Sequence, residues 1–138
     1  MASPSTPSSS DSKVLDLLDA CESYAGLRTE LAQKLSAGIF QLAQARKHGK
    51  MTLSADDVSR EDFDARLVLE TNSSSTSSSI GEISVVEHGG DAKMDSLMMF
   101  TALPPPALRR AQALFEDATR VAAVLAQRVR DIDRVLQS

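Results

Sequence analysis

The chain has 138 residues, a length that suits one domain. It holds four Phe, one Tyr and no Trp, and its apolar residues are mainly Ala, Leu and Val, so aromatic anchors for a globular core are scarce. The net charge of -4 is modest, and the sequence has no basic stripe of the kind that binds nucleic acid. These features predict a helical chain with no nucleic-acid partner.

The charge is unevenly placed along the chain. Residues 11–50 hold six basic and five acidic residues, and residues 107–138 hold six basic and four acidic. Residues 51–106 hold three basic and ten acidic residues. The two ends are therefore close to neutral, and the middle of the chain carries the excess negative charge.

The single cysteine, Cys21, has no second cysteine to form an internal disulfide with, which favours a reducing compartment. Residues 1–10 lack the apolar segment of a secretory signal. No run approaches the roughly 18 apolar residues of a membrane span. We therefore expect no direct membrane insertion.

A first long helix is predicted over residues 12–48. Residues 1–11 are rich in Ser and Pro and are predicted to be a disordered tail. Asp11 or Ser12 is the predicted N-cap, and Gly49 is the predicted stop. The apolar residues follow the a and d positions of one heptad frame, interrupted by Arg28 and Gly38. They are Val14, Leu17, Cys21, Tyr24, Leu31, Leu35, Leu42 and Ala45. The frame places Cys21 on the seam, as a small buried side chain.

A second long helix is predicted over residues 105–137. Pro104, Pro105 and Pro106 precede it, and proline suits a first helical turn. Its heptad positions carry Ala111, Leu114, Ala118, Val121, Leu125, Ile132 and Val135. Two such helices, each on the order of 50 Å long, can pack antiparallel.

The connector, residues 49–103, is predicted to hold a small β-hairpin. Residues 66–70 and 80–87 are aliphatic or β-branched with partial alternation, and they flank a run of Ser, Thr and Asn. A lone two-stranded hairpin is marginal in water, so we expect it to lie against one end of the helices. The predicted fold is mainly α, a single domain over residues 12–138 that forms an antiparallel two-helix coiled-coil hairpin.

Both helices carry a third apolar column beside the a and d positions. In the first helix it is Leu18, Ala25, Ala32 and Ile39, and in the second Leu108, Phe115, Ala122, Val129 and Leu136. Exposed, this column would form a long hydrophobic strip, which soluble monomers avoid. The pattern favours cover by a helix of another chain over the alternative that a mostly alanine column is simply tolerated.

The sequence offers no convincing catalytic, cofactor or metal site. His48 and His88 lack a second ligand at helical spacing, and the acidic residues between 56 and 64 lack the glycine turn of a Ca²⁺ loop. No nucleophile motif surrounds the Ser runs. Met94, Met98, Met99 and Phe100 suit either an adaptable contact surface or a cap on the hairpin core.

Four stretches resemble a known family. They are residues 27–46, which end in LAQAR, residues 63–67 (FDARL), residues 95–104 (DSLMMFTALP) and residues 107–115 (ALRRAQALF). In their order and placement they look like the soluble coiled-coil assembly factor of the vacuolar-type proton ATPase. At Met99-Phe100-Thr101 the chain departs from the Trp-Phe-Gly of that family.

The resemblance implies a non-enzymatic role with no cofactor. Members of the family work peripherally on the cytosolic face of the endoplasmic reticulum, and the early secretory vesicles are a further expected location. They pair there with a membrane-embedded assembly factor and transiently engage the large membrane subunit of the proton pump. The positions that match the family pattern, and are thus candidate partner contacts, are Leu42, Ala43, Arg46, Phe100, Pro104, Leu108, Arg109, Gln112 and Phe115.

Three other classes fit the sequence less well. A prefoldin-like chaperone subunit has the same order of helix, β-hairpin and helix, but the short strands and Ser-rich loop weaken that assignment. A generic homodimeric coiled-coil adaptor would self-associate without another partner. A small helical enzyme would need converging titratable groups, and the sequence shows none.

Overall fold

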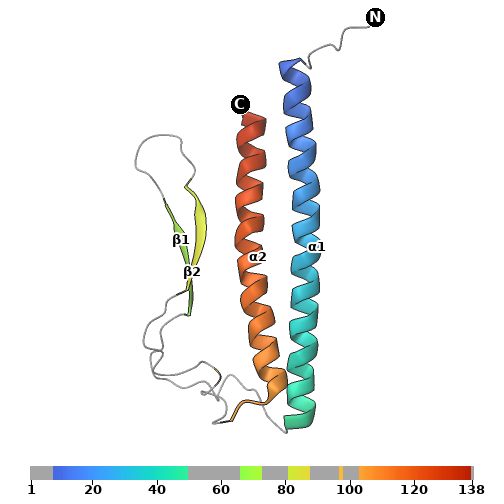
Figure 1. Cartoon of the computed structure of the whole chain (residues 1–138), viewed down its shortest axis with the longest axis vertical. Coiled ribbons are helices and arrows are strands. Elements are labelled where there is room, and N and C mark those ends of the chain that lie inside the picture. Colours follow the sequence, from blue (N-terminus) through green and yellow to red (C-terminus); the bar gives the residue numbers. More distant parts are fainter. Residues whose placement is uncertain (1–7, 50–65, 73–80, 88–96, 98–102, 138) are drawn as a thin grey trace, which may run out of the picture.

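The computed structural model describes residues 8–49, 66–72, 81–87, 97 and 103–137. Two helices, α1 (Ser9–Gly49) and α2 (Pro106–Gln137), flank two strands, β1 (Leu67–Thr71) and β2 (Ile83–Glu87). The strands pair antiparallel, with Leu67 opposite Glu87 and Thr71 opposite Ile83. The helices run side by side in opposite directions (Figure 1). The predicted helical hairpin with a β-hairpin in its connector is confirmed.

A reciprocal cap at Ser8 precedes α1, which begins at Ser9, three residues before the predicted start. The Asp11 N–H donates to Ser8 Oγ at 3.3 Å, and the Ser8 N–H donates to Asp11 Oδ2 at 3.2 Å. This capping-box arrangement satisfies two backbone donors that a helix end would leave open. The predicted cap at Asp11 or Ser12 is therefore wrong: Asp11 lies inside the first turn and Ser8 is the N-cap.

The N-terminus of α2 is set by prolines, close to the prediction. The Pro105 carbonyl accepts from the N–H groups of Leu108 and Arg109 at 3.0 and 3.3 Å, and Pro106 is the first helical residue. A proline there loses no hydrogen bond, because the first-turn N–H groups have no intrahelical acceptor.

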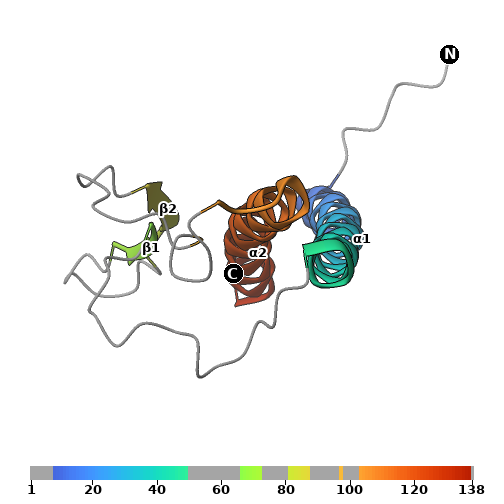
Figure 2. The same ribbon diagram turned by 90° about the horizontal axis from the view of Figure 1, so that it is seen from below.

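The β-hairpin lies alongside α2, on the side of α2 away from α1 (Figures 1 and 2). The expectation that it sits against one end of the helices is therefore wrong. The order across the molecule is hairpin, α2, α1, as the end view shows (Figure 2). As a result α2 has neighbours on two sides, whereas the main neighbour of α1 among the described elements is α2.

The seam is built from the predicted columns on α2 but from only one of the two predicted columns on α1. Of the predicted frame on α1, the column with Leu17, Tyr24 and Leu31 is half-buried, while Val14, Cys21 and Leu35 are exposed. The second seam column lies on the other side, and its residues are Ala20, Leu27, Lys34 and Gln41. The predicted burial of Cys21 is therefore wrong.

The error lies in the choice of columns. The column that contains Leu17 has a heptad neighbour on each side, one that contains Cys21 and one that contains Ala20, and either pair gives the alternating spacing of three and four residues. The sequence pattern favoured the more apolar neighbour, which lies outside the seam except at its last member, Leu42, which is half-buried.

The two helices approach each other closely at Gly38. A Cβ added there would lie 2.9 Å from Phe115 Cε1 and 3.0 Å from Cζ, so the ring occupies the space that a side chain would need. Gly38, which interrupts the apolar frame in the sequence, is buried. We call the end at which α1 finishes and α2 begins the closed end. There Ala45 and Leu108 are 1% and 4% exposed and form a core with Leu97.

Gly38→Ala should destabilise the fold, whereas Gly26→Ala should stabilise it. Alanine in a helix interior gains about 0.5–1 kcal/mol over glycine, and nothing lies within 4 Å of a Cβ at Gly26. At Gly38 the methyl group must displace the Phe115 ring, and overpacking of this kind costs about 1–3 kcal/mol. Urea unfolding followed by circular dichroism measures both.

The matched control is Phe115→Leu, which removes the ring. In that background Gly38→Ala should recover the stabilisation seen at Gly26. If Gly38→Ala stabilises the otherwise unchanged chain as much as Gly26→Ala does, the close helix contact is not formed.

Candidate partner-binding surface

The described residues form one apolar groove near the closed end of the helices. It is lined by side chains of α1, α2, the start of β1 and residue 97, and its volume is about 320 Å³. The apolar lining residues are Leu42, Leu67, Leu97, Leu108, Ala111 and Phe115, and the polar ones are Arg66, Gln112, Glu116 and Thr119. A concave apolar surface with few polar groups is the usual form of a site that accepts apolar groups of a ligand or partner.

Phe115 contributes to both the helix seam and the groove. One edge of its ring lies over Gly38, and the same side chain is part of the groove lining. The seam contact thus holds the ring in place. A partner that enters the groove would meet a prepositioned aromatic side chain, which loses little conformational entropy on binding.

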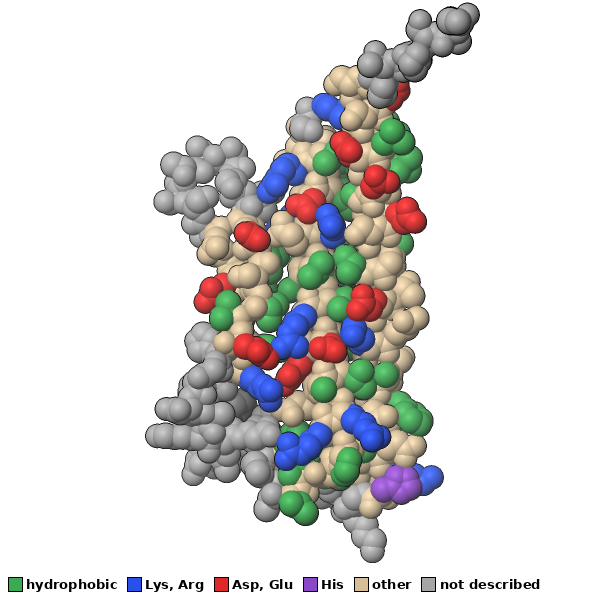
Figure 3. All heavy atoms as spheres, viewed as in Figure 1, with side chains coloured by type: hydrophobic (Ala, Val, Ile, Leu, Met, Phe, Trp, Pro, Cys, Tyr) green, Lys and Arg blue, Asp and Glu red, His purple; other side chains and the backbone are tan. Residues whose placement is uncertain are grey.

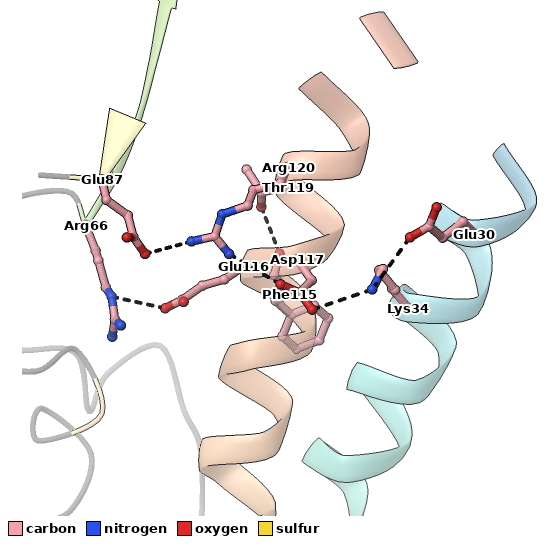
Figure 4. Close-up of polar contacts among 9 residues, drawn as sticks. All are labelled: Glu30, Lys34, Arg66, Glu87, Phe115, Glu116, Asp117, Thr119 and Arg120. Atoms are coloured by element: carbon pink, nitrogen blue, oxygen red, sulfur yellow. Dashed lines mark hydrogen bonds and ion pairs between the residues drawn. The ribbon is translucent and has the colours of Figure 1, made fainter. Parts of the chain in front are cut away.

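Ion pairs connect α2 with its neighbours on both sides at the level of the groove (Figure 4). On the α1 side, Lys34 Nζ lies 3.5 Å from Asp117 Oδ2. On the hairpin side, Arg66 Nε lies 3.4 Å from Glu116 Oε1, and Arg120 Nη2 lies 2.7 Å from Glu87 Oε1. These side chains are partly exposed, so each pair contributes at most about 1 kcal/mol. Their main effect is to orient the hairpin on α2.

Two hydrogen bonds attach the far end of the hairpin to the same face of α2. The Ile83 N–H donates to Gln127 Oε1 at 3.1 Å, and Arg130 Nη1 donates to the Gly81 carbonyl at 2.8 Å. Gln127 Nε2 in turn donates to Asp131 Oδ1, which fixes the amide orientation. Ala123, which falls on this face of α2, is buried. The hairpin therefore covers the face of α2 opposite the seam with α1, whereas Val129 and Leu136 of the predicted third column stay exposed.

The structure gathers four of the nine candidate contact residues in the groove: Leu42, Leu108, Gln112 and Phe115. Pro104 is buried next to the start of α2, and Ala43, Arg46 and Arg109 are exposed near the same end. Phe100, like Met94, Met98 and Met99, lies outside the described residues. The set therefore includes residues that shape the surface and residues that a partner can reach directly.

Sequence reasoning missed Leu97, Leu67 and the polar groove residues Glu116 and Thr119. Their positions depend on how the connector returns to α2, which no periodicity in the sequence records. For Arg66 and Glu116 the opposite charges were visible, but their 50-residue separation gave no reason to pair them.

Among the described residues, no group of three His, Cys, Asp or Glu side chains is arranged to hold a metal ion. Within the same ranges, neither helix combines the length and apolarity that a bilayer crossing requires. What the described residues do present is a helical hairpin with an apolar groove at its closed end.

The fold defines a class, the antiparallel helical hairpin with a β-hairpin laid along one helix. Comparison with models of known protein families gives no match for the chain, and comparison with curated proteins likewise gives none.

Gln127→Leu should loosen the hairpin from α2 without unfolding the helices. The change removes the acceptor of the Ile83 N–H, and a hydrogen bond of this kind contributes about 0.5–1.5 kcal/mol. Amide exchange of Ile83, followed by NMR, should become roughly fivefold faster, which corresponds to about 1 kcal/mol. Gln137→Leu, the same change at the exposed end of α2, should leave that rate unchanged. Equal Ile83 rates in both variants would contradict this docking.

Proposed function

We propose that this chain is a non-enzymatic assembly factor for the membrane sector of a vacuolar-type proton ATPase. It acts at the cytosolic face of the endoplasmic reticulum and binds a membrane-embedded co-factor through its closed end. Through that complex it transiently engages the large membrane subunit of the pump. The resemblance in residues 27–46, 63–67, 95–104 and 107–115 supplies the identity of these partners.

The main support for the proposal is that four residues from the family-like stretches line one groove. Leu42 comes from the last turns of α1, and Leu108, Gln112 and Phe115 come from the first turns of α2. More than 60 positions separate the two segments in the sequence. An apolar concavity at this point suits a partner that inserts aliphatic or aromatic side chains, the usual anchors of protein–protein contacts.

The exposed residues near the groove, two of them arginines, suit the rim of an interface around such an apolar anchor. Ala43, Arg46 and Arg109 are exposed at the same end of the helices, outside the groove lining. Arginine is enriched at interfaces because its guanidinium makes several directed hydrogen bonds. We assign the two arginines to partner contacts around the apolar centre.

The test combines a physical and a physiological readout. Purification of the tagged chain in mild detergent, followed by mass spectrometry, should recover one multi-spanning membrane protein of the endoplasmic reticulum. Cells that lack the chain should have under-acidified vacuolar compartments, as a ratiometric pH dye reports. Normal acidification in those cells would overturn the proposal. A homo-hexamer with strands paired between subunits would instead identify a prefoldin-like chaperone.

Gln112→Glu should reduce recovery of the membrane co-factor about tenfold. The change is nearly isosteric, and it places a carboxylate in an apolar groove that already contains Glu116. Desolvating that charge on binding costs more than about 1.4 kcal/mol, the equivalent of a factor of ten. Acidification in cells that carry only this variant should fall in parallel.

Gln33→Glu is the matched control, because Gln33 is exposed on α1 and does not line the groove. It should retain normal recovery and acidification. Circular dichroism should show the same helicity for both variants. If both variants recover the co-factor equally well, the groove is not the binding site.

A further inference from the structure

A second apolar surface lies on α1, away from the groove. Its residues are Val14, Leu18, Cys21, Ala25, Ala32, Leu35 and Ile39, and all are exposed. Leu18 is 59% exposed and Ile39 is 61% exposed. We call this surface the α1 strip. It extends over 26 residues, roughly 38 Å along the helix. Figure 3 shows some hydrophobic side chains near the two ends of α1 on its side away from α2, with acidic side chains between them.

Along the centre of the α1 strip, the order of side-chain sizes is the same in both directions. Leu18, Ala25, Ala32 and Ile39 follow one another at intervals of seven residues, so they form one column. The order of side-chain sizes is large, small, small, large, and its midpoint falls between Arg28 and Thr29. A second α1 that runs antiparallel across this midpoint would place Leu18 against Ile39 of the partner subunit, and Ala25 against Ala32 of the partner subunit.

Alanines at the centre of such a pair allow two helices to approach closely, and the larger side chains at each end then meet. A two-fold axis through the midpoint makes the interface isologous, because the same surface serves both subunits. A column with its large residues at only one end would not have this property.

The charges of α1 also favour an antiparallel second copy. Residues 9–27 carry four acidic residues, Asp11, Asp16, Asp19 and Glu22, and one basic residue, Lys13. Residues 28–49 carry four basic residues, Arg28, Lys34, Arg46 and Lys47, and one acidic residue, Glu30. Antiparallel pairing brings the acidic half of one helix against the basic half of the other. Parallel pairing would place like charges together, which opposes association.

The position of α1 leaves room for a second copy. Its main neighbour among the described elements is α2, and the β-hairpin lies on the far side of α2 (Figure 2). On α1 the groove is lined by Leu42, which is not part of the strip.

From these observations we propose that the α1 strip is the interface of a symmetric antiparallel dimer of this chain. The symmetric order of side-chain sizes, the acidic and basic halves of α1 and the exposed position of this helix all fit a second, antiparallel copy of α1. The proposal does not depend on the proposed function, because it concerns the purified chain alone.

Sedimentation equilibrium of the purified full-length chain tests the proposal. The expected species is a dimer with twice the chain mass of 14.8 kDa. Ile39→Glu should raise the dissociation constant about 100-fold, because each dimer carries two substituted sites and each costs roughly tenfold. A chain that remains monomeric at concentrations of tens of micromolar would overturn the proposal.

Phe40→Glu is the matched control. Phe40 is the next residue, 60% exposed, and points about 100° around the helix from Ile39. It should leave the dissociation constant unchanged, and circular dichroism should show equal helicity for the two variants. An equal loss of dimer in both variants would contradict the assignment of the interface to the α1 strip.

Disulfide trapping in a Cys21→Ser background tests the orientation. A mixture of Leu18→Cys and Ile39→Cys chains should form a cross-linked dimer under mild oxidation, whereas each variant alone should not. Cross-linking of Leu18→Cys with itself would indicate a parallel pair and overturn the proposal. If the dimer fails but the groove variants still lose the membrane co-factor, the proposed function stands without the dimer.

Discussion

The contact between Phe115 and Gly38 sets the spacing and register of the two helices. Only a residue without a side chain leaves room for the ring, since an added Cβ would meet it at 2.9 Å. With the ring in this place, Lys34 reaches Asp117 one turn further along, and Ala45 and Leu108 meet at the closed end. The same ring forms part of the groove. A shift in helix register would therefore alter the seam, the ion pair and the groove together.

The central position of α2 determines which surfaces remain for partners. One side of α2 packs on α1, and another side carries the β-hairpin through Glu116, Arg120, Gln127 and Arg130. The strands thus cover the face of α2 opposite its seam with α1, and they leave Val129 and Leu136 of the predicted third column exposed. On α1 the strip stays exposed. The groove and the α1 strip are both apolar, and each suits a different kind of partner.

Helical periodicity and terminal residues were enough to predict the two helices and the hairpin between them. The start of α2 at the prolines and the two strands were found within a few residues. The pattern failed where the outcome depends on three-dimensional neighbours. Apolar spacing selected the column with Cys21 although the column with Ala20 faces α2, and it treated Gly38 as an interruption although the residue is buried.

The candidate site was predicted only in part, because some of its residues come together only through the fold. The family resemblance nominated Leu42, Leu108, Gln112 and Phe115, and the fold brings these four to one groove. Leu67 and Leu97 complete the groove from the connector, whose path follows from contacts with α2 that no local pattern encodes. The location of the hairpin was predicted wrongly because its docking relies on single polar contacts, such as the one from Ile83 to Gln127.

The most direct measurement of the central claim is a nuclear Overhauser experiment on the isotopically labelled chain. The account predicts strong cross-peaks between the Phe115 ring protons and the α-protons of Gly38, because one of those protons points along the direction in which an added Cβ would reach the ring. Cross-peaks from the Phe115 ring to other parts of α1 but not to Gly38 would show a different register, and would contradict both the seam and the groove built on it.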